Sequence, residues 1–204
     1  MKRLVGGGLS LVVALCGGCA APPVVGDPAP KVSDSAQESA YRAAFDKETV
    51  QRQVYALFDT RMFVAATFLS TAFREARVRR IAAFQKIPPG EVQSRIAEER
   101  AEREKYDDFI VGVHMNEPRY DDFGRTNSIW RVVLETASGE VKPESVKRLG
   151  RADLNLRALY PTMGTFWVAY RFRFPSSVPV RDGQPMTLRI SSNVGRAELT
   201  YPAR

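Results

Sequence analysis

The chain has 204 residues, of which 44% are hydrophobic and 26% are charged; these values are ordinary for a globular protein and exclude a disordered or fibrous one. With 30 basic and 23 acidic residues, the formal net charge is +7, which favours anionic partners without requiring nucleic acid. The sequence contains 2 cysteines and 1 histidine. These are too few for a zinc site of the usual kind. No glycine-rich phosphate loop follows a predicted strand, because residues 6–8 lie inside the N-terminal apolar run, and so we assign no metal site and no cofactor.

The first 18 residues have the features of a signal peptide. Lys2 and Arg3 precede an apolar run over residues 4–15. This run is shorter than the roughly 20 residues that a membrane-spanning helix needs, so we interpret residues 1–18 as a targeting segment.

Both cysteines lie at the end of this segment, at Cys16 and Cys19. Gly17 and Gly18 precede Cys19, and this arrangement resembles the lipobox of bacterial lipoproteins, in which a peptidase cleaves before a cysteine that carries diacylglycerol. Cys19 fits the cleavage site, whereas Cys16 follows the bulky Leu15. The resemblance implies a chain that is lipidated at Cys19.

A lipid at this position implies anchoring in a membrane of the cell envelope. By the same resemblance, Ala20 after the cysteine implies the outer membrane, facing the periplasm, if the source is Gram-negative. An ordinary secretory signal cleaved after Ala21 is the alternative and leaves a soluble exported protein. In either case we expect no nucleic-acid partner.

Residues 19–34 are rich in proline and alanine, which predicts a tether, and the part after Cys19, residues 20–34, reaches on the order of 45 Å at about 3.1 Å per residue. Ser35 and Glu38 then have the spacing of a capping box, which predicts the start of a helix. From residue 36 to 86 there is no proline or glycine. Apolar residues in this stretch recur at steps of three and four: Tyr55, Phe58, Met62, Ala65, Leu69 and Ala72.

This spacing predicts a helix, interrupted near residues 46–49, whose uncharged part at 62–72 is buried on two sides. Pro88, Pro89 and Gly90 end it, and residues 91–105 form a second helix with charged residues four apart. We therefore predict a helical hairpin over residues 35–106. Its buried part would be covered either by a sheet or by another chain.

After Tyr106 the apolar period changes to two, which is typical of half-buried strands. The alternating apolar residues are Phe109, Val111, Val113 and Met115; Trp130, Val132 and Leu134; Phe166, Val168, Tyr170, Phe172 and Phe174; and Met186, Leu188 and Ile190. Further strands are predicted at 141–149, 154–159 and 196–201. The predicted fold class is α+β, with an antiparallel β-sandwich of immunoglobulin-like size over residues 107–204.

Few residues favour catalysis. His114 is the single histidine and is interpreted as a structural residue on a strand. The tetrapeptide Tyr-Asp-Asp-Phe occurs at 106–109 and 120–123, where its aspartates either bind calcium, act as an acid/base pair or terminate strands. The third interpretation is favoured, so no catalytic residue and no metal ligand is assigned.

A basic patch falls late in the first predicted helix, at Arg74, Arg77, Arg79 and Arg80. Such a patch either contacts anionic lipid headgroups or forms a solvated helix face, and the solvated face is favoured.

Strand alternation places four arginines and one tryptophan opposite the predicted core, on one outer face of the sheet. This face either is a solvated surface that keeps the protein soluble or binds an anionic ligand. These residues are Arg131, Trp167, Arg171, Arg173 and Arg189.

The sequence thus predicts a lipid-anchored, non-enzymatic envelope protein that serves as an interaction or scaffold module with a protein partner. The alternative is a binding module for an anionic envelope glycan or lipid, and a hydrolase is a distant third.

Overall fold

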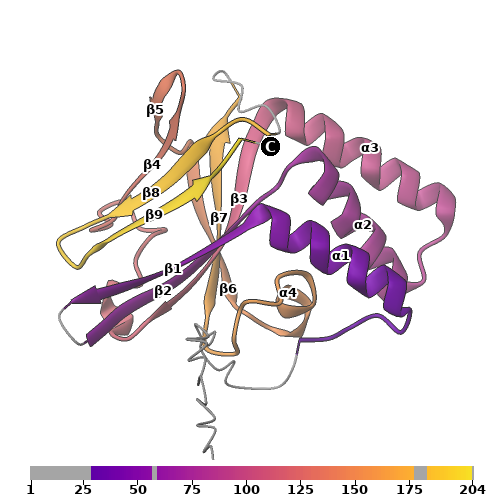
Figure 1. Ribbon diagram of the computed structural model, residues 1–204, viewed down its shortest axis with the longest axis horizontal. Helices are drawn as coiled ribbons and strands as arrows, with labels where there is room; N and C mark the ends of the chain where they lie inside the picture. Colours follow the sequence, from indigo (N-terminus) through magenta and orange to yellow (C-terminus); the bar gives the residue numbers. More distant parts are fainter. Residues whose placement is uncertain (1–28, 57–58, 177–182, 204) are drawn as a thin grey trace, which may run out of the picture.

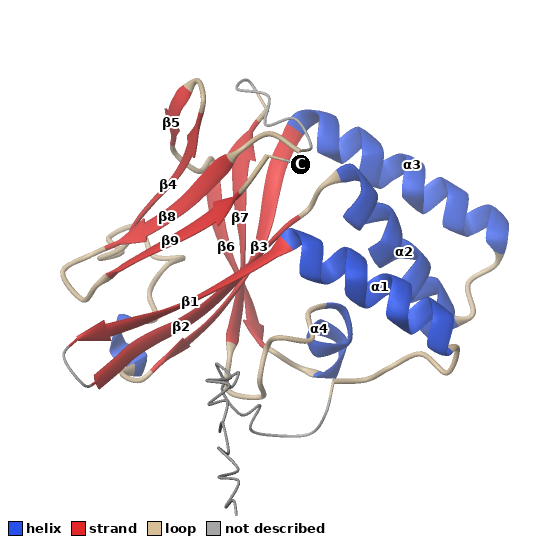
Figure 2. Cartoon of the chain, in the orientation of Figure 1, coloured by secondary structure: helices blue, strands red, loops and turns tan. Residues whose placement is uncertain are grey.

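The protein is described by a computed structural model in which residues 29–56, 59–176 and 183–203 are placed. These residues form two antiparallel β-sheets and a layer of helices that covers one face of the larger sheet (Figures 1 and 2). The mixed α+β class is confirmed. The predicted signal peptide, Cys19 and residues 20–28 of the predicted tether lie outside the described residues.

The helices are α1 (Ser35–Glu48), α2 (Thr71–Gln85), α3 (Pro89–Lys105) and α4 (Leu154–Leu159), with a 3₁₀ turn η1 (Pro118–Tyr120). The five-stranded sheet has the order β1-β2-β3-β7-β6, formed by β1 (Thr49–Ala56), β2 (Asp59–Phe68), β3 (Tyr106–Met115), β7 (Val168–Pro175) and β6 (Ser145–Arg151). The four-stranded sheet has the order β5-β4-β8-β9, formed by β5 (Gly139–Val141), β4 (Arg131–Thr136), β8 (Met186–Ser191) and β9 (Arg196–Tyr201).

Alternate residues of both sheets meet in a shared apolar core. Phe109 and Val111 of β3 and Phe172 of β7 belong to this core, together with Leu188 of β8 and Leu199 of β9, and all are fully buried. The period-two pattern predicted for residues 109–115, 130–134, 166–174 and 186–190 is therefore confirmed except at Phe166, which is 62% exposed and lies before β7.

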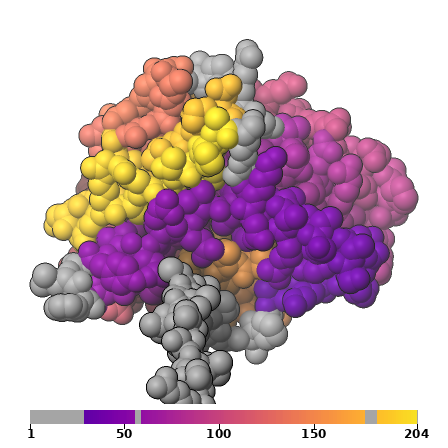
Figure 3. Space-filling model, in the orientation of Figure 1, coloured from indigo at the N-terminus to yellow at the C-terminus, as the bar shows by residue number. Residues whose placement is uncertain are grey.

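At one edge of the molecule, β9 of the smaller sheet lies against β1 of the larger one (Figure 3). The approach is close, because a Cβ added at Gly195 would lie 2.3 Å from Val54 Cγ1. The Tyr201 hydroxyl also donates a hydrogen bond of 2.6 Å to the Ala66 carbonyl of β2. These contacts join the two sheets along this edge.

The opposite face of the larger sheet carries the helices. Tyr41, Phe45 and Phe73 of α1 and α2 form a second apolar cluster with Ile110 of β3 and Ala169 of β7. The backbone at Gly112 of β3 is in close contact with the segment between α4 and β7, since a Cβ there would lie 2.8 Å from Met163 Cγ and 3.0 Å from Trp167 Cε3. One side of the sheet thus packs on helices and the other on a second sheet.

The helix predicted through residues 49–68 is wrong. Residues 49–56 form β1 and residues 59–68 form β2, paired from Thr49 opposite Thr67 to Ala56 opposite Asp59 with a register shift between Val54 and Tyr55. The cause is burial of β2 on both faces, since Val64 lies in the core between the sheets and Ala65, its neighbour with the opposite orientation, is also buried. A strand covered on both sides loses its polar alternation and resembles a buried helix in sequence.

The stretch predicted as an interrupted helix over residues 36–86 thus divides into α1, β1, β2 and α2, and it is α2 that packs against α3. The strand predicted at 154–159 is also wrong, because these residues form α4, whose N-cap Asp153 accepts a hydrogen bond of 2.8 Å from the Leu156 amide. The predicted capping box is displaced as well: Asp34, not Ser35, caps α1, accepting hydrogen bonds from the amides of Ala36 and Gln37.

Candidate functional site

Charged side chains gather where the helices pack on the larger sheet. On β7, Phe172 and Phe174 face the core between the sheets, so the intervening Arg171 and Arg173 face the helices. On β3, Asp108 lies opposite Arg173 in the strand register. A carboxylate and two arginines of the sheet therefore lie beneath α2 and α3.

Asp108 is the centre of a buried ion-pair network. It is 1% exposed and accepts a hydrogen bond of 2.9 Å from Arg74 Nη2 and one of 2.8 Å from Arg173 Nε. Burial alone would raise the pKa of Asp108, but the two guanidinium groups outweigh burial and lower the pKa below its ordinary value. Arg74 also donates to the Leu69 carbonyl at 3.0 Å and to Glu99 at 2.8 Å.

The network extends along α2 and α3. Arg77 is hydrogen-bonded to Glu99 and donates a hydrogen bond of 3.1 Å to the Tyr160 hydroxyl. Arg173 is hydrogen-bonded to Glu102 of α3, and its guanidinium lies 4.0 Å from the centre of the Tyr106 ring. Most cationic groups of this interface are therefore fixed in place by carboxylates.

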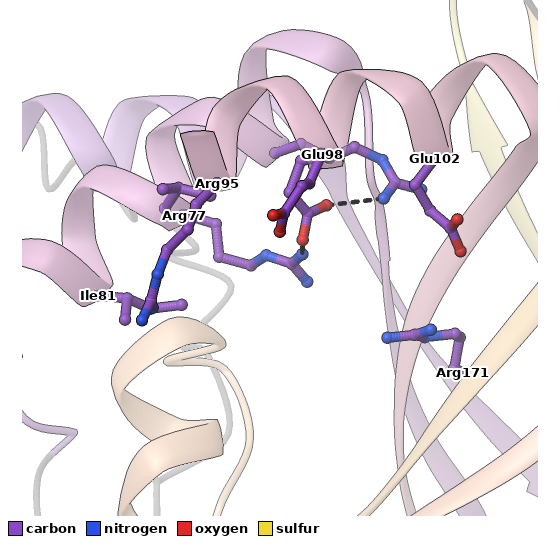
Figure 4. A pocket seen from close by; sticks show the side chains of 9 residues that line it. Arg77, Ile81, Arg95, Glu98, Glu102 and Arg171 are labelled. Carbon is purple, nitrogen blue, oxygen red and sulfur yellow. Dashed lines mark hydrogen bonds and ion pairs between the residues drawn. The ribbon is translucent and has the colours of Figure 1, made fainter. Parts of the chain in front are cut away.

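A cavity of about 440 Å³ opens beside this network, between α2, α3 and β7 (Figure 4). We refer to it as the Arg171 cavity. Its lining contains four arginines and three glutamates, together with apolar Val78 and Ile81. The charged lining residues are Arg74, Arg77, Arg95, Arg171, Glu98, Glu99 and Glu102.

Arg171 differs from the other arginines of the interface. Its guanidinium points into the cavity (Figure 4) and makes no hydrogen bond or ion pair with any described residue. Its Nε is buried without an acceptor, and so is the Nε of Arg77 on the other side of the cavity. The terminal nitrogens of Arg171 line the cavity and have no partner among the described residues, so they are suited to bind carboxylate or phosphate oxygens.

The predicted outer face of arginines is wrong, because the structure divides it between the two sheets. Arg131 and Arg189 lie on β4 and β8 of the smaller sheet, and both pair with Glu140. Arg171 and Arg173 lie beneath the helices of the larger sheet. Trp167 precedes β7 and packs against β3 at Gly112.

The other sequence candidates lie away from the cavity lining. His114 on β3 is half-buried, and its ring lies 6.1 Å from that of Phe63. Asp107 is paired with Arg103, and Asp121 accepts a hydrogen bond of 2.7 Å from the Tyr170 hydroxyl. Asp122 accepts hydrogen bonds from Ser128 and the Ile129 amide within a turn.

Both Tyr-Asp-Asp-Phe tetrapeptides therefore contribute structural carboxylates. Across the described parts of the chain, no three His, Cys, Asp or Glu residues are arranged so that they could hold a metal ion.

The solvated basic face predicted on α2 is wrong at two of its four positions. Arg74 and Arg80 are 2% and 3% exposed. Arg80 pairs with Glu38 of α1 and donates to the Ala158 carbonyl of α4, so it joins three helices. Glu99 is four residues from both Arg95 and Arg103, a spacing that suits a pair within α3, but it binds Arg74 and Arg77 of α2. The sequence shows the basic patch itself. It does not show which carboxylates pair with the patch, because this depends on how α3 packs against α2.

Comparisons with known proteins add little to this geometry. No known protein family matches the sequence, and no curated protein does. A crystal structure of a novel protein of unknown function from Burkholderia pseudomallei K96243 is similar at a TM-score of 0.45 and 11% identity. The match covers 81% of this chain and 83% of that one. Among the helices of the described segments, none has the length and apolar character needed to cross a bilayer.

Proposed function

We propose that the protein is a lipid-anchored, non-enzymatic module of the cell envelope that binds an anionic group of an envelope polymer in the Arg171 cavity. The anchor is the lipid at Cys19, and the outer membrane, facing the periplasm, is the proposed site. The two facing sheets serve as a β-sandwich scaffold. The observation that carries the ligand proposal is the unpartnered guanidinium of Arg171 in the cavity.

The surroundings of Arg171 support a binding role. The neighbouring Arg74, Arg77 and Arg173 are held by Asp108, Glu99 and Glu102, so the walls of the cavity are fixed before a ligand arrives. A site that is ordered in advance loses less entropy on binding. The volume of about 440 Å³ lies within the range of small-molecule sites, so a charged sugar unit is of suitable size.

Hydrolysis is not proposed, because the candidate aspartates are engaged within the fold. Asp108 is bound by two arginines, and Asp121 by Tyr170 and Arg148. A general acid or base needs a carboxyl group within reach of a substrate.

The binding proposal is tested with Arg171→Gln in the full chain, using a purified anionic envelope polymer and a salt series. We expect wild-type binding that weakens as salt rises, and at least a tenfold loss of affinity in the variant with unchanged melting. Arg131→Gln is the matched control: it removes one cation from the other sheet, and binding should remain. Salt-insensitive binding, or equal binding by Arg171→Gln, would overturn the proposal.

The anchor is tested separately by membrane fractionation. Cys19→Ala should release the protein into the soluble fraction, whereas Cys16→Ala should leave it in the membrane fraction. Equal retention of both variants contradicts lipidation at Cys19.

A further inference from the structure

Large apolar side chains are exposed at the end of the molecule where α4 lies. Phe166, in the segment before β7, is 62% exposed, Leu154 at the start of α4 is 55% exposed, and Leu149 of β6 is 37% exposed. Exposed apolar residues that cluster at one place mark an interaction surface more often than single ones do.

The backbone brings these three residues to the same edge. Arg151 at the end of β6 lies opposite Val168 at the start of β7, and the Ala152 amide donates a hydrogen bond of 2.8 Å to the Trp167 carbonyl. Phe166 and Leu154 are direct neighbours of these paired segments. We call this region, formed by Leu149, Leu154, Phe166 and the exposed cation Arg151, the α4 surface.

The described chain also begins at this end. Arg80 donates one hydrogen bond of 3.1 Å to the Pro30 carbonyl and another of 2.6 Å to the Ala158 carbonyl in α4. Residues 29–34 therefore start beside α4 and run to α1, as Figure 1 shows. Lys31 in this segment is exposed and adds a second cation.

The distance from here to the lipid is short. Ten residues, 20–29, connect Cys19 to this point, and a chain of that length spans at most about 36 Å. A folded domain of this size is about 40 Å across. The chain is therefore too short to pass around the domain and present the opposite end, where β5 lies, to the bilayer (Figure 1).

We propose that the α4 surface rests on the bilayer that holds the lipid of Cys19; this rests on the lipid anchor of the proposed function. Phe166 and Leu154 enter the interface between headgroups and acyl chains, and Arg151 and Lys31 contact anionic headgroups. The protein then lies with a fixed face on the membrane, and the hairpin of β4 and β5 points into the aqueous space.

The test uses the full chain, processed and lipidated at Cys19. Because cleavage removes Cys16 and lipid occupies Cys19, an introduced cysteine is the free thiol to which a fluorophore attaches. Asn155→Cys places the label on α4, and Ser138→Cys places a matched label between β4 and β5 at the opposite end. Each protein is reconstituted into vesicles of phosphatidylethanolamine and phosphatidylglycerol that contain a lipid with a quencher in its upper acyl chain.

We expect the label at position 155 to be quenched several-fold more than the label at position 138. Adding Leu154→Ser and Phe166→Ser should reduce quenching at 155 to the level at 138. Tyr55→Ser, which removes an aromatic ring on β1 that is 58% exposed, should leave quenching at 155 unchanged.

Recovery of protein with the vesicles reports the anchor, and quenching reports the surface. If the protein is anchored but both labels are quenched equally, or if the serine substitutions have no effect, the α4 surface does not face the bilayer. Protection of position 155 by a second copy or by another protein, without quenching by lipid, would also show that the α4 surface does not face the bilayer. If the protein does not remain with the vesicles, the anchor fails and this proposal fails with it.

Discussion

The two faces of β7 are held in place by different interactions. Tyr170, Phe172 and Phe174 point into the apolar core between the sheets, whereas Arg171 and Arg173 point under the helices into a network of ion pairs. Adjacent residues of a single strand thus point to opposite faces, one into the apolar core between the sheets and the next into the ion-pair network beneath the helices.

The difference shows how each layer is specified. Apolar packing is non-directional, so the core between the sheets is stabilised by area removed from water. A buried ion pair adds little net stability but requires an exact partner, because an unpaired buried charge is costly. The helical layer is therefore positioned by carboxylates that match particular arginines. Arg171 lies beneath the same helices but has no carboxylate partner among the described residues.

The largest expected effect comes from placing a charge in the apolar part of the helical layer. Leu69 is 1% exposed and packs in the cluster that includes Phe73. Leu69→Asp should lower the free energy of unfolding by about 4 kcal/mol or more, because the carboxylate has no cation assigned to it. Chemical denaturation measures this. Unchanged stability with loss of self-association would instead identify residue 69 as an interface residue.

Asp108→Ala should follow, with a loss of about 3–5 kcal/mol, because Arg74 and Arg173 then remain buried with less compensating charge. A second variant, in which apolar residues replace the whole network, shows whether the ion pairs add net stability. Arg74→Met, Asp108→Leu and Arg173→Met together should recover most of that stability. If the triple variant is as unstable as Asp108→Ala, the network stabilises the fold through its own attraction.

Acidification should weaken the helical layer by a smaller effect, through the ion pairs of Glu38 in α1. Burial raises the pKa of Glu38, but hydrogen bonds from Arg80, Arg42 and the Val32 amide outweigh it and hold the pKa at about 2. Because this value lies below the ordinary one, the stabilisation is complete above about pH 5 and is lost as the pH falls toward 2. Glu38→Gln should therefore be less stable at neutral pH and lose less on acidification, as measured by melting at several pH values. A parallel pH dependence in both proteins contradicts this assignment.

The smallest effect is expected on the outer face of the smaller sheet. Arg131 is 62% exposed and Glu140 is 44% exposed, so their pair is well solvated. Arg131→Gln should change stability by less than about 1 kcal/mol in a denaturant titration. A larger change would mean that this surface is ordered by more than the pair itself.

Much of this layering was readable in the sequence, because a half-buried strand keeps a period of two. The alternation predicts the core face correctly for Phe109, Val111, Phe172 and Leu188. The alternation also indicated that Arg171 and Arg173 share a face opposite Phe172. It does not indicate which sheet β7 joins, and it therefore predicts, wrongly, that Arg131 and Arg189 share that surface.

The failures have related causes. The apolar residues within 49–68 fit a helical period as well as a strand. Ala65 is buried as well as Val64, so the polar alternation that would distinguish a strand from a helix is lost. Ion pairs between different helices also cannot be predicted from the sequence. The spacing of Arg95 and Glu99 suits a pair within one helix, but Glu99 binds Arg74 and Arg77, which are distant in sequence.

The hydrogen bond from Tyr201 to Ala66 has a consequence for the order in which the protein folds. Rings of Phe68 and Phe109 also pack against Tyr201, so residues from β2 and β3 complete their environment only when β9 is in place. Contacts across so much sequence slow folding, because the intervening chain must be ordered first. During synthesis from the N-terminus, β2 and β3 therefore remain incompletely packed until β9, the last strand of the chain, has been made and has joined them.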